Sequence, residues 1–190
     1  KGNYRTADID RVPPYWPDCE ETRNDMLDFA FELEHFDAHL GKMVEKLKAE
    51  GLLDNTIIVV TADNGMPFPR IKGQAYHASN HLPMLVYWPK GIPQKGVKNF
   101  DFVNFIDLAP TFLEVAGIDG EAKGMQQIEG KSMLSLIKSG KSKYDSSRNH
   151  VLIGKERHDI GRPDDAGYPI RGIVTERYLY VYNFEPDRWP

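Results

Sequence analysis

The sequence predicts an α/β fold with a mainly parallel sheet, followed by a small antiparallel C-terminal subdomain. Three patterns support this prediction. Apolar residues recur at helical spacing over about residues 20–50, and a continuous β-branched run, Thr56–Thr61, comes after them. Three short strand-like runs close the chain. Helices and buried strands are therefore expected first, and antiparallel strands last.

The first regular element is expected to be one long amphipathic helix, from about Glu20 to Glu50. Asp18 and Glu21 have the spacing of a helix-start capping pair, and Gly51 is a typical stop. The prolines within residues 1–17 predict an extended lead-in. The apolar stripe comprises Met26, Phe29, Ala30, Leu33, Phe36, Leu40, Met43, Val44 and Leu47.

Two strands and two helices are expected next. Thr56–Thr61 suits a central strand of a parallel sheet, buried on both faces, because such strands are continuous apolar runs. A second strand is expected over Met84–Trp88. Asp107 can cap a helix that continues through about Ala116, and residues 131–139 are a weaker helix candidate.

The last three strands are expected over His150–Ile153, Ile170–Thr175 and Tyr178–Phe184. Only Glu176-Arg177 separates the last two, which predicts a hairpin. We therefore expect antiparallel pairing in this part of the chain.

Length and composition limit the possible classes of protein. The 190 residues fit one ordinary domain or two small ones, and we predict a boundary between 1–140 and 141–190. The net charge of −4 argues against a general nucleic-acid binder. No apolar run approaches the roughly 20 residues that span a bilayer, and a single cysteine excludes an internal disulfide framework. Because the chain starts at Lys1 without Met, we expect a mature product or a piece of a longer protein.

The chemically informative segment follows the β-branched run directly. Asp63 and Asn64 offer a carboxylate and an amide oxygen at the carboxyl end of a strand, where ligand sites of α/β sheets gather. This pair suits a hard cation such as Ca²⁺ or Mg²⁺, although Ca²⁺ would need further ligands. Gly65 lets the chain turn away. A simple Asp-Asn-Gly turn is the alternative interpretation.

A proline-bracketed loop follows and presents two cations, Arg70 and Lys72. A metal with an adjacent Lys or Arg can hold and polarise a tetrahedral oxyanion such as sulfate or phosphate. The alternative is a surface loop with solvated cations.

Several motifs occur in one order over about residues 18–130. They are Asp37-x-x-x-Gly41, Gly51–Thr56, Thr61–Gly65, Lys72-Gly73, Leu82-Pro83-Met84, Trp88-Pro89 and Asp107–Thr111. This order resembles the second half of a formylglycine-dependent sulfatase of the alkaline-phosphatase-like superfamily. The segment Asp63–Pro69 is similar to the sulfamidase (heparan N-sulfatase) branch, and so is the tail from Gly154–His158 through Asn183–Pro190.

The resemblance implies an alkaline-phosphatase-like sandwich and specific roles for the cationic and oxygen-bearing residues. Asp63 and Asn64 would be the downstream pair of calcium ligands, with Mg²⁺ as the alternative metal. Lys72 would contact the sulfate and neutralise its charge, and Arg70 is the second choice.

The resemblance also implies a formylglycine nucleophile made from Cys or Ser in a Cys/Ser-x-Pro/Ala-x-Arg motif. Cys19 and Arg23 have the right spacing, but Glu21 stands where Pro or Ala is needed. We therefore expect the nucleophile and the upstream calcium ligands on sequence preceding this chain, and we expect this chain alone to be inactive.

Substrate contacts are expected from His77 and from the cluster Glu156, Arg157 and His158. A mixed-charge cluster after a strand suits recognition of sugar hydroxyls and carboxylates, whereas a solvated strand end is the alternative. Arylsulfatase-like members usually carry Arg-x-Pro where this chain reads His81-Leu82-Pro83, so the role of His81 is open.

The resemblance implies that the full-length enzyme removes sulfate from sulfated glycans, with N-sulfoglucosamine of heparan type favoured. A sulfated saccharide is the expected partner, an oligomer is open, and the family implies a secreted, periplasmic or lysosomal location. The alternatives are an O-sulfatase, a phosphodiesterase of the same superfamily, or a non-catalytic glycan-binding module. Asn64 in place of His after Asp63 favours the sulfatase over the zinc phosphodiesterases.

Overall fold

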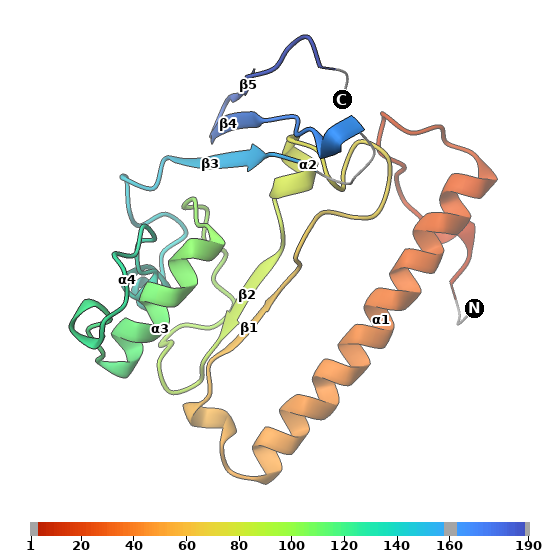
Figure 1. The fold of residues 1–190 in the computed structure, drawn as a ribbon. Coiled ribbons are helices and arrows are strands. Elements are labelled where there is room, and N and C mark those ends of the chain that lie inside the picture. The colour runs from red at the N-terminus through yellow and green to blue at the C-terminus, as the bar shows by residue number, and fades with distance from the viewer. Residues whose placement is uncertain (1–3, 158–162, 189–190) are drawn as a thin grey trace. The chain divides into compact units, whose positions relative to one another are not determined.

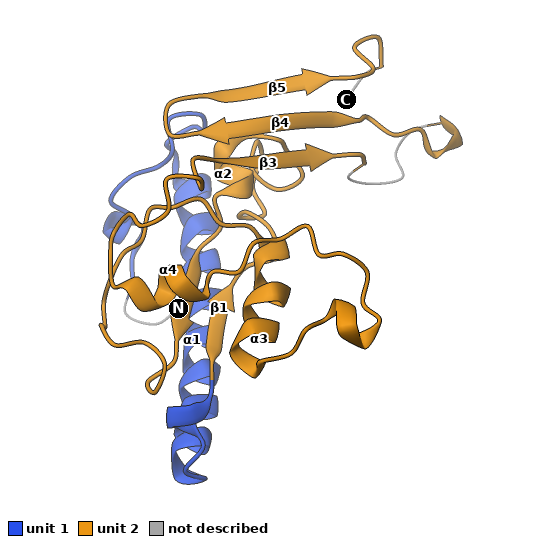
Figure 2. Cartoon of the chain, turned by 90° about the vertical axis from the view of Figure 1, so that its left-hand side faces the viewer, with its two compact units in different colours: residues 1–56 blue, residues 57–190 orange. Residues whose placement is uncertain are grey.

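The computed structural model describes residues 4–157 and 163–188. The chain forms two compact units, residues 1–56 and residues 57–190 (Figure 2). None of the helices within the described ranges is long and apolar enough to cross a membrane. The domain boundary near residue 140 stays a prediction.

The first unit contains the predicted long helix, which is confirmed as α1, Glu20–Ala49. It is preceded by the 3₁₀ turn η1, Thr6–Asp8, and followed by η2, Leu53–Asn55. Cys19 occupies the N-cap position, and its Sγ lies 3.3 Å from Oγ1 of Thr22. The helix ends where Gly51 adopts a φ of 69°, a left-handed conformation that favours glycine.

Arg23 ties the extended lead-in to the start of α1. Its Nε donates to Oδ1 of Asp18 at 2.6 Å, and its Nη1 donates to the carbonyl oxygen of Ile9 at 2.8 Å. The predicted apolar stripe is not a buried face of this unit, because Leu33, Phe36 and Met43 are exposed and the buried residue of the helix is Leu27.

The second unit begins with two strands, β1 (Ile58–Thr61) and β2 (Met84–Tyr87). They pair antiparallel, with Ile58 opposite Tyr87 and Thr61 opposite Met84. The prediction of a parallel strand buried on both faces is wrong for this chain, since β1 is only partly buried. The connecting segment contains one short helix, α2 (His77–Asn80), and returns the chain to the same end of the sheet, which produces an antiparallel pair.

Two short helices follow, α3 (Leu108–Ala116) and α4 (Leu134–Ser139). The 3₁₀ turns η3 (Phe105–Asp107) and η4 (Glu121–Lys123) lie before and after α3. Both helices were predicted, the second with an earlier start at residue 131. Each ends at a glycine with positive φ, 65° at Gly117 and 64° at Gly140.

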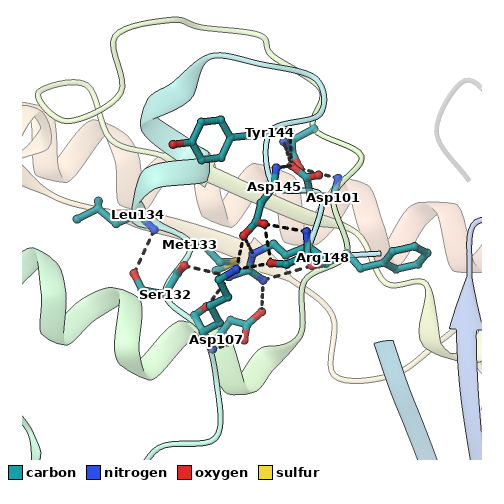
Figure 3. Close-up of polar contacts among 12 residues, drawn as sticks. Asp101, Asp107, Ser132, Met133, Leu134, Tyr144, Asp145 and Arg148 are labelled. Atoms are coloured by element: carbon teal, nitrogen blue, oxygen red, sulfur yellow. Dashed lines mark hydrogen bonds and ion pairs between the residues drawn. The ribbon is translucent and has the colours of Figure 1, made fainter. Parts of the chain in front are cut away.

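A buried polar network holds the loops around α3 and α4 together (Figure 3). Asp107 accepts hydrogen bonds from Nη1 of Arg148 at 2.8 Å and from the backbone N–H of Lys131 at 2.8 Å. Arg148 donates from Nη2 to the carbonyl oxygens of Lys131 and Ser132, at 2.6 and 3.0 Å. One arginine therefore fastens three segments that are distant in the sequence.

The last three strands form an antiparallel sheet in the order β3-β4-β5, with β3 at His150–Lys155, β4 at Ile170–Thr175 and β5 at Leu179–Asn183. The 3₁₀ turn η5, Pro163–Asp165, precedes β4. The predicted hairpin and the antiparallel C-terminal part are confirmed. Every strand pair within residues 4–157 and 163–188 is antiparallel, so the predicted parallel pairing does not occur there.

Candidate functional site

A cavity of about 990 Å³ in the second unit brings together segments that are distant in the sequence. It is lined by the loop after β1, by α2 and by the end of β3. Figures 1 and 2 both show α2 beside the sheet of β3, β4 and β5. Five of the predicted site residues line this cavity: Asp63, Asn64, His77, Glu156 and Arg157.

Asp63 and Asn64 lie side by side in the loop that follows β1. Nδ2 of Asn64 donates to Oδ1 of Asp63 at 2.5 Å. This hydrogen bond is the main reason why the pKa of the Asp63 carboxyl lies below its usual value, and the positive charge of Lys72 lowers it further. Asp63 is therefore a carboxylate at neutral pH, while the amide oxygen of Asn64 remains an acceptor.

The two side chains fit part of a site for a hard cation. Both present oxygen, which Ca²⁺ and Mg²⁺ prefer, but Ca²⁺ takes six to eight oxygen ligands. The described part of the chain contains no group of three or more His, Cys, Asp or Glu residues placed to hold a metal. Asp63 and Asn64 therefore supply a fraction of such a site, and other oxygen ligands would have to complete it.

Gly65 sets the position of this loop through a close backbone approach. A Cβ atom at Gly65 would lie 2.5 Å from Cγ2 of Ile71 and 2.7 Å from the carbonyl oxygen of Ala78. Ile71 is fully buried, and its carbonyl oxygen accepts a hydrogen bond from Oγ of Ser79. The absence of a side chain at Gly65 thus lets the Asp63 loop pack against the segment that carries Lys72 and His77.

The two predicted sulfate-contacting cations are both exposed, and neither is among the residues that line the cavity. Lys72 lies close enough to Asp63 for its charge to lower the pKa of that carboxyl. The backbone of Arg70 adopts a φ of 66°, which is uncommon for a residue with a side chain. Of the two cations, we associate Lys72 with the Asp63–Asn64 pair, because its charge lowers the pKa of the Asp63 carboxyl.

His77 is the first residue of α2, and His81 follows directly after that helix. Their ring centroids are 4.7 Å apart, with the planes at 60°. Both residues line the cavity. His81, whose role the sequence left open, therefore belongs to the same wall as His77, and its spacing four residues after His77 is the signal for this placement.

The charged cluster after β3 is engaged in ion pairs. Glu156 pairs with Nη2 of Arg171, and Arg157 pairs with Asp165. His158 lies outside the described residues. Lys155, the last residue of β3, also lines the cavity and is not among the residues predicted from the sequence. Its place at the end of a strand, directly before Glu156 and Arg157, is the signal that could have identified it.

Comparison with known protein families identifies two overlapping matches. Residues 7–118 match the family model described as sulfatase. Residues 71–190 match the family model described as N-sulphoglucosamine sulphohydrolase, C-terminal. Each match covers more than half of the chain.

Curated relatives agree with these matches. The chain is 26% identical to an ulvan-active sulfatase of Formosa agariphila, over 93% of this chain and 27% of that protein. It is 29% identical to human N-sulphoglucosamine sulphohydrolase, over 90% of this chain and 34% of the relative. An N-acetylglucosamine-6-O-sulfatase of Bacteroides thetaiotaomicron is 30% identical, over 86% of this chain and 29% of that relative. The chain thus spans about a third of the length of these relatives.

A solved structure supports the fold. It is a protein in complex with its substrate D-glucosamine-2-N,6-O-disulfate, and it matches with a TM-score of 0.61 over 80% of this chain and 32% of that protein, at 23% identity. The chain has the alkaline-phosphatase-like fold expected from the sequence, and it belongs to the sulfatase family.

Proposed function

We propose that the full-length protein hydrolyses sulfate from sulfated glycans and that this chain supplies part of its active site. The observation that supports this proposal most strongly is the cavity of about 990 Å³. In a chain of the sulfatase family, it is lined by Asp63, Asn64, His77 and the end of β3. A cavity of this size is typical of sites for small organic ligands. A monosaccharide or disaccharide unit is the class of substrate that we expect there.

N-sulfoglucosamine of heparan type is the favoured substrate. The match over residues 71–190 to the C-terminal model of N-sulphoglucosamine sulphohydrolase supports this choice. The Bacteroides N-acetylglucosamine-6-O-sulfatase relative supports an O-sulfated glucosamine as the second candidate. Both candidates place a sulfated glucosamine unit in the cavity.

The residues of this chain would bind and orient the sulfate. Asp63 and Asn64 would hold part of a Ca²⁺ site, and the ion when bound would polarise a sulfate oxygen. Lys72, which lies close to Asp63, would neutralise negative charge on the sulfate as it is transferred. His77, the first residue of α2, would contact the substrate from the wall of the cavity that α2 forms. We place the formylglycine nucleophile on preceding sequence, and we expect this chain alone to be inactive.

The test is sulfate release by the full-length enzyme, produced together with formylglycine-generating activity. N-sulfoglucosamine should be hydrolysed faster than glucosamine 6-sulfate, and Lys72→Ala should lower kcat/KM about 100-fold or more. Arg70→Ala is the matched control and should change kcat/KM less than threefold. The proposal is overturned if neither substrate releases sulfate, and the assignment of Lys72 is overturned if Arg70→Ala causes the larger loss.

A further inference from the structure

We propose that Lys155 recognises a second anionic group of the saccharide, in addition to the sulfate that is removed. The group would be another sulfate or a uronate carboxylate. This inference rests on the proposed function and predicts a preference for glycans that carry a second negative charge.

The strand geometry places Lys155 on the half-buried face of the C-terminal sheet. Side chains alternate along a strand, so Lys155 shares a face with Val151 and Ile153. These two residues and Lys155 are half-buried, whereas Leu152 and Gly154 between them are exposed. Lys155 lies opposite Ile170 of β4 in the antiparallel register. The ammonium group is therefore carried on the same side of the sheet as the partly buried apolar residues.

Glu156 and Arg157 are neutralised by partners, whereas Lys155 has no partner among the described residues. Glu156 is paired with Arg171, and Arg157 is paired with Asp165. Within residues 4–157 and 163–188, Lys155 forms no ion pair and no side-chain hydrogen bond that would satisfy its ammonium group. A partly buried cation without a partner loses hydration without compensation. An anion bound in the cavity would provide that compensation.

The position of Lys155 separates it from the proposed sulfate-transfer residues. Asp63 and Asn64 belong to the loop after β1, whereas Lys155 ends β3, and both elements line the same cavity. Lys72, the cation associated with Asp63, does not line the cavity, whereas Lys155 does, so Lys155 is a second cation at a different place and suits a second anion. The pattern corresponds to a ligand with charges at two places rather than one.

The experiment compares the full-length wild type with Lys155→Ala and Lys155→Arg on three substrates. They are N-sulfoglucosamine, glucosamine N,6-disulfate, and an N-sulfoglucosamine disaccharide with a terminal uronate. Lys155→Ala should lower kcat/KM about 10- to 100-fold on whichever doubly anionic substrate supplies the second group. It should change kcat/KM less than twofold on N-sulfoglucosamine, and Lys155→Arg should restore most of the loss.

Lys123→Ala is the matched control, because Lys123 is an exposed lysine of η4 that does not line the cavity. An equal loss on all three substrates, or no loss on either doubly anionic one, overturns the role of Lys155. Calorimetric binding of glucosamine N,6-disulfate and of the N-sulfoglucosamine disaccharide with a terminal uronate gives an independent readout. If wild type releases no sulfate but Lys155→Ala still weakens the binding of either ligand about tenfold, the proposed function fails while the anion contact stands. Unchanged binding of both ligands in that case overturns the contact as well.

Discussion

Nη1 of Arg148 lies 2.8 Å from Oδ2 of Asp107, and the two side chains are only 6% and 8% exposed (Figure 3). Asp107 also accepts the backbone N–H groups of Asn104 and Lys131. The carboxylate is thus the point at which η3, the loop before α4 and the loop before β3 meet. Its charge is balanced by one arginine.

Replacing that arginine should destabilise the second unit strongly. Arg148→Met leaves Asp107 buried without its counter-charge, and removal of one partner of a buried pair costs about 3–5 kcal/mol. The expected result is a large fall in the thermal midpoint of the full-length protein. Arg5→Ala is the control, because the Arg5–Asp8 pair is 79% and 37% exposed and exposed pairs contribute little to stability. Similar shifts for both variants would contradict this role.

Substitution of Gly65 should disturb the site as well as the fold. In Gly65→Ala the new Cβ meets Ile71 and the backbone of Ala78, so the Asp63 loop must move and about 1–3 kcal/mol of stability is lost. Sulfate release should fall further than stability alone explains. Gly41→Ala is the matched control, because nothing lies within 4 Å of its Cβ and alanine in a helix stabilises by up to about 1 kcal/mol. A neutral Gly65→Ala variant would show that the contact is unimportant.

Stability should fall in acid partly because of Asp101. Burial raises the pKa of this carboxyl, but hydrogen bonds from Asn99 and from the backbone of Tyr144 and Asp145 outweigh burial and leave the pKa lowered. The unfolded chain therefore binds the proton more readily, with a pKa of about 3.9, so this contribution is complete well above pH 4. It is lost as the pH falls through the lower native pKa.

The measurement for Asp101 is the thermal midpoint at pH 7 and pH 3. Asp101→Asn should have a lower thermal midpoint than wild type at pH 7, and its midpoint should fall less than that of wild type between pH 7 and pH 3. The variant Asp10→Asn, at an exposed position, should show the same fall in thermal midpoint as wild type. A loss for Asp101→Asn equal to that of wild type would remove Asp101 as a cause.

Metal dependence should be traceable to Asn64. Asn64→Ala removes an amide oxygen from an incomplete oxygen site, so the calcium concentration for half-maximal activity of the full-length enzyme should rise at least about tenfold. Chelation should abolish wild-type activity, and added Ca²⁺ should restore it. Asn55→Ala, an exposed amide before β1, should behave as wild type. Activity that persists in excess chelator would contradict the metal proposal.

The sequence patterns predicted local structure better than pairing. The spacing of apolar residues and the flanking Asp18 and Gly51 located α1 within one residue of its observed end, because capping and periodicity are local properties. The run Thr56–Thr61 correctly indicated a strand, but β-branched residues favour strands of either direction. Its antiparallel partner depends on the path of residues 62–83, which no local pattern determines.

In the candidate site, too, local features could be predicted from the sequence and non-local contacts could not. Asp63 and Asn64 were recognisable because their chemistry and their place after a strand are local features. Lys155 was harder to single out, because only the ion pairs of Glu156 with Arg171 and of Arg157 with Asp165 distinguish it from its charged neighbours. Which charges are neutralised is a property of the folded chain.

Cys19, the only cysteine of the 190 residues, is partly buried at the start of α1. In this chain a thiol-reactive dye therefore labels one position, and a rise in its labelling rate on heating or in denaturant reports opening of the first unit there. Because the buried pair of Asp107 and Arg148 belongs to the second unit, thiol labelling and a global melting curve follow different parts of the molecule. The chain thus carries its own reporter for whether the two units unfold together or one at a time.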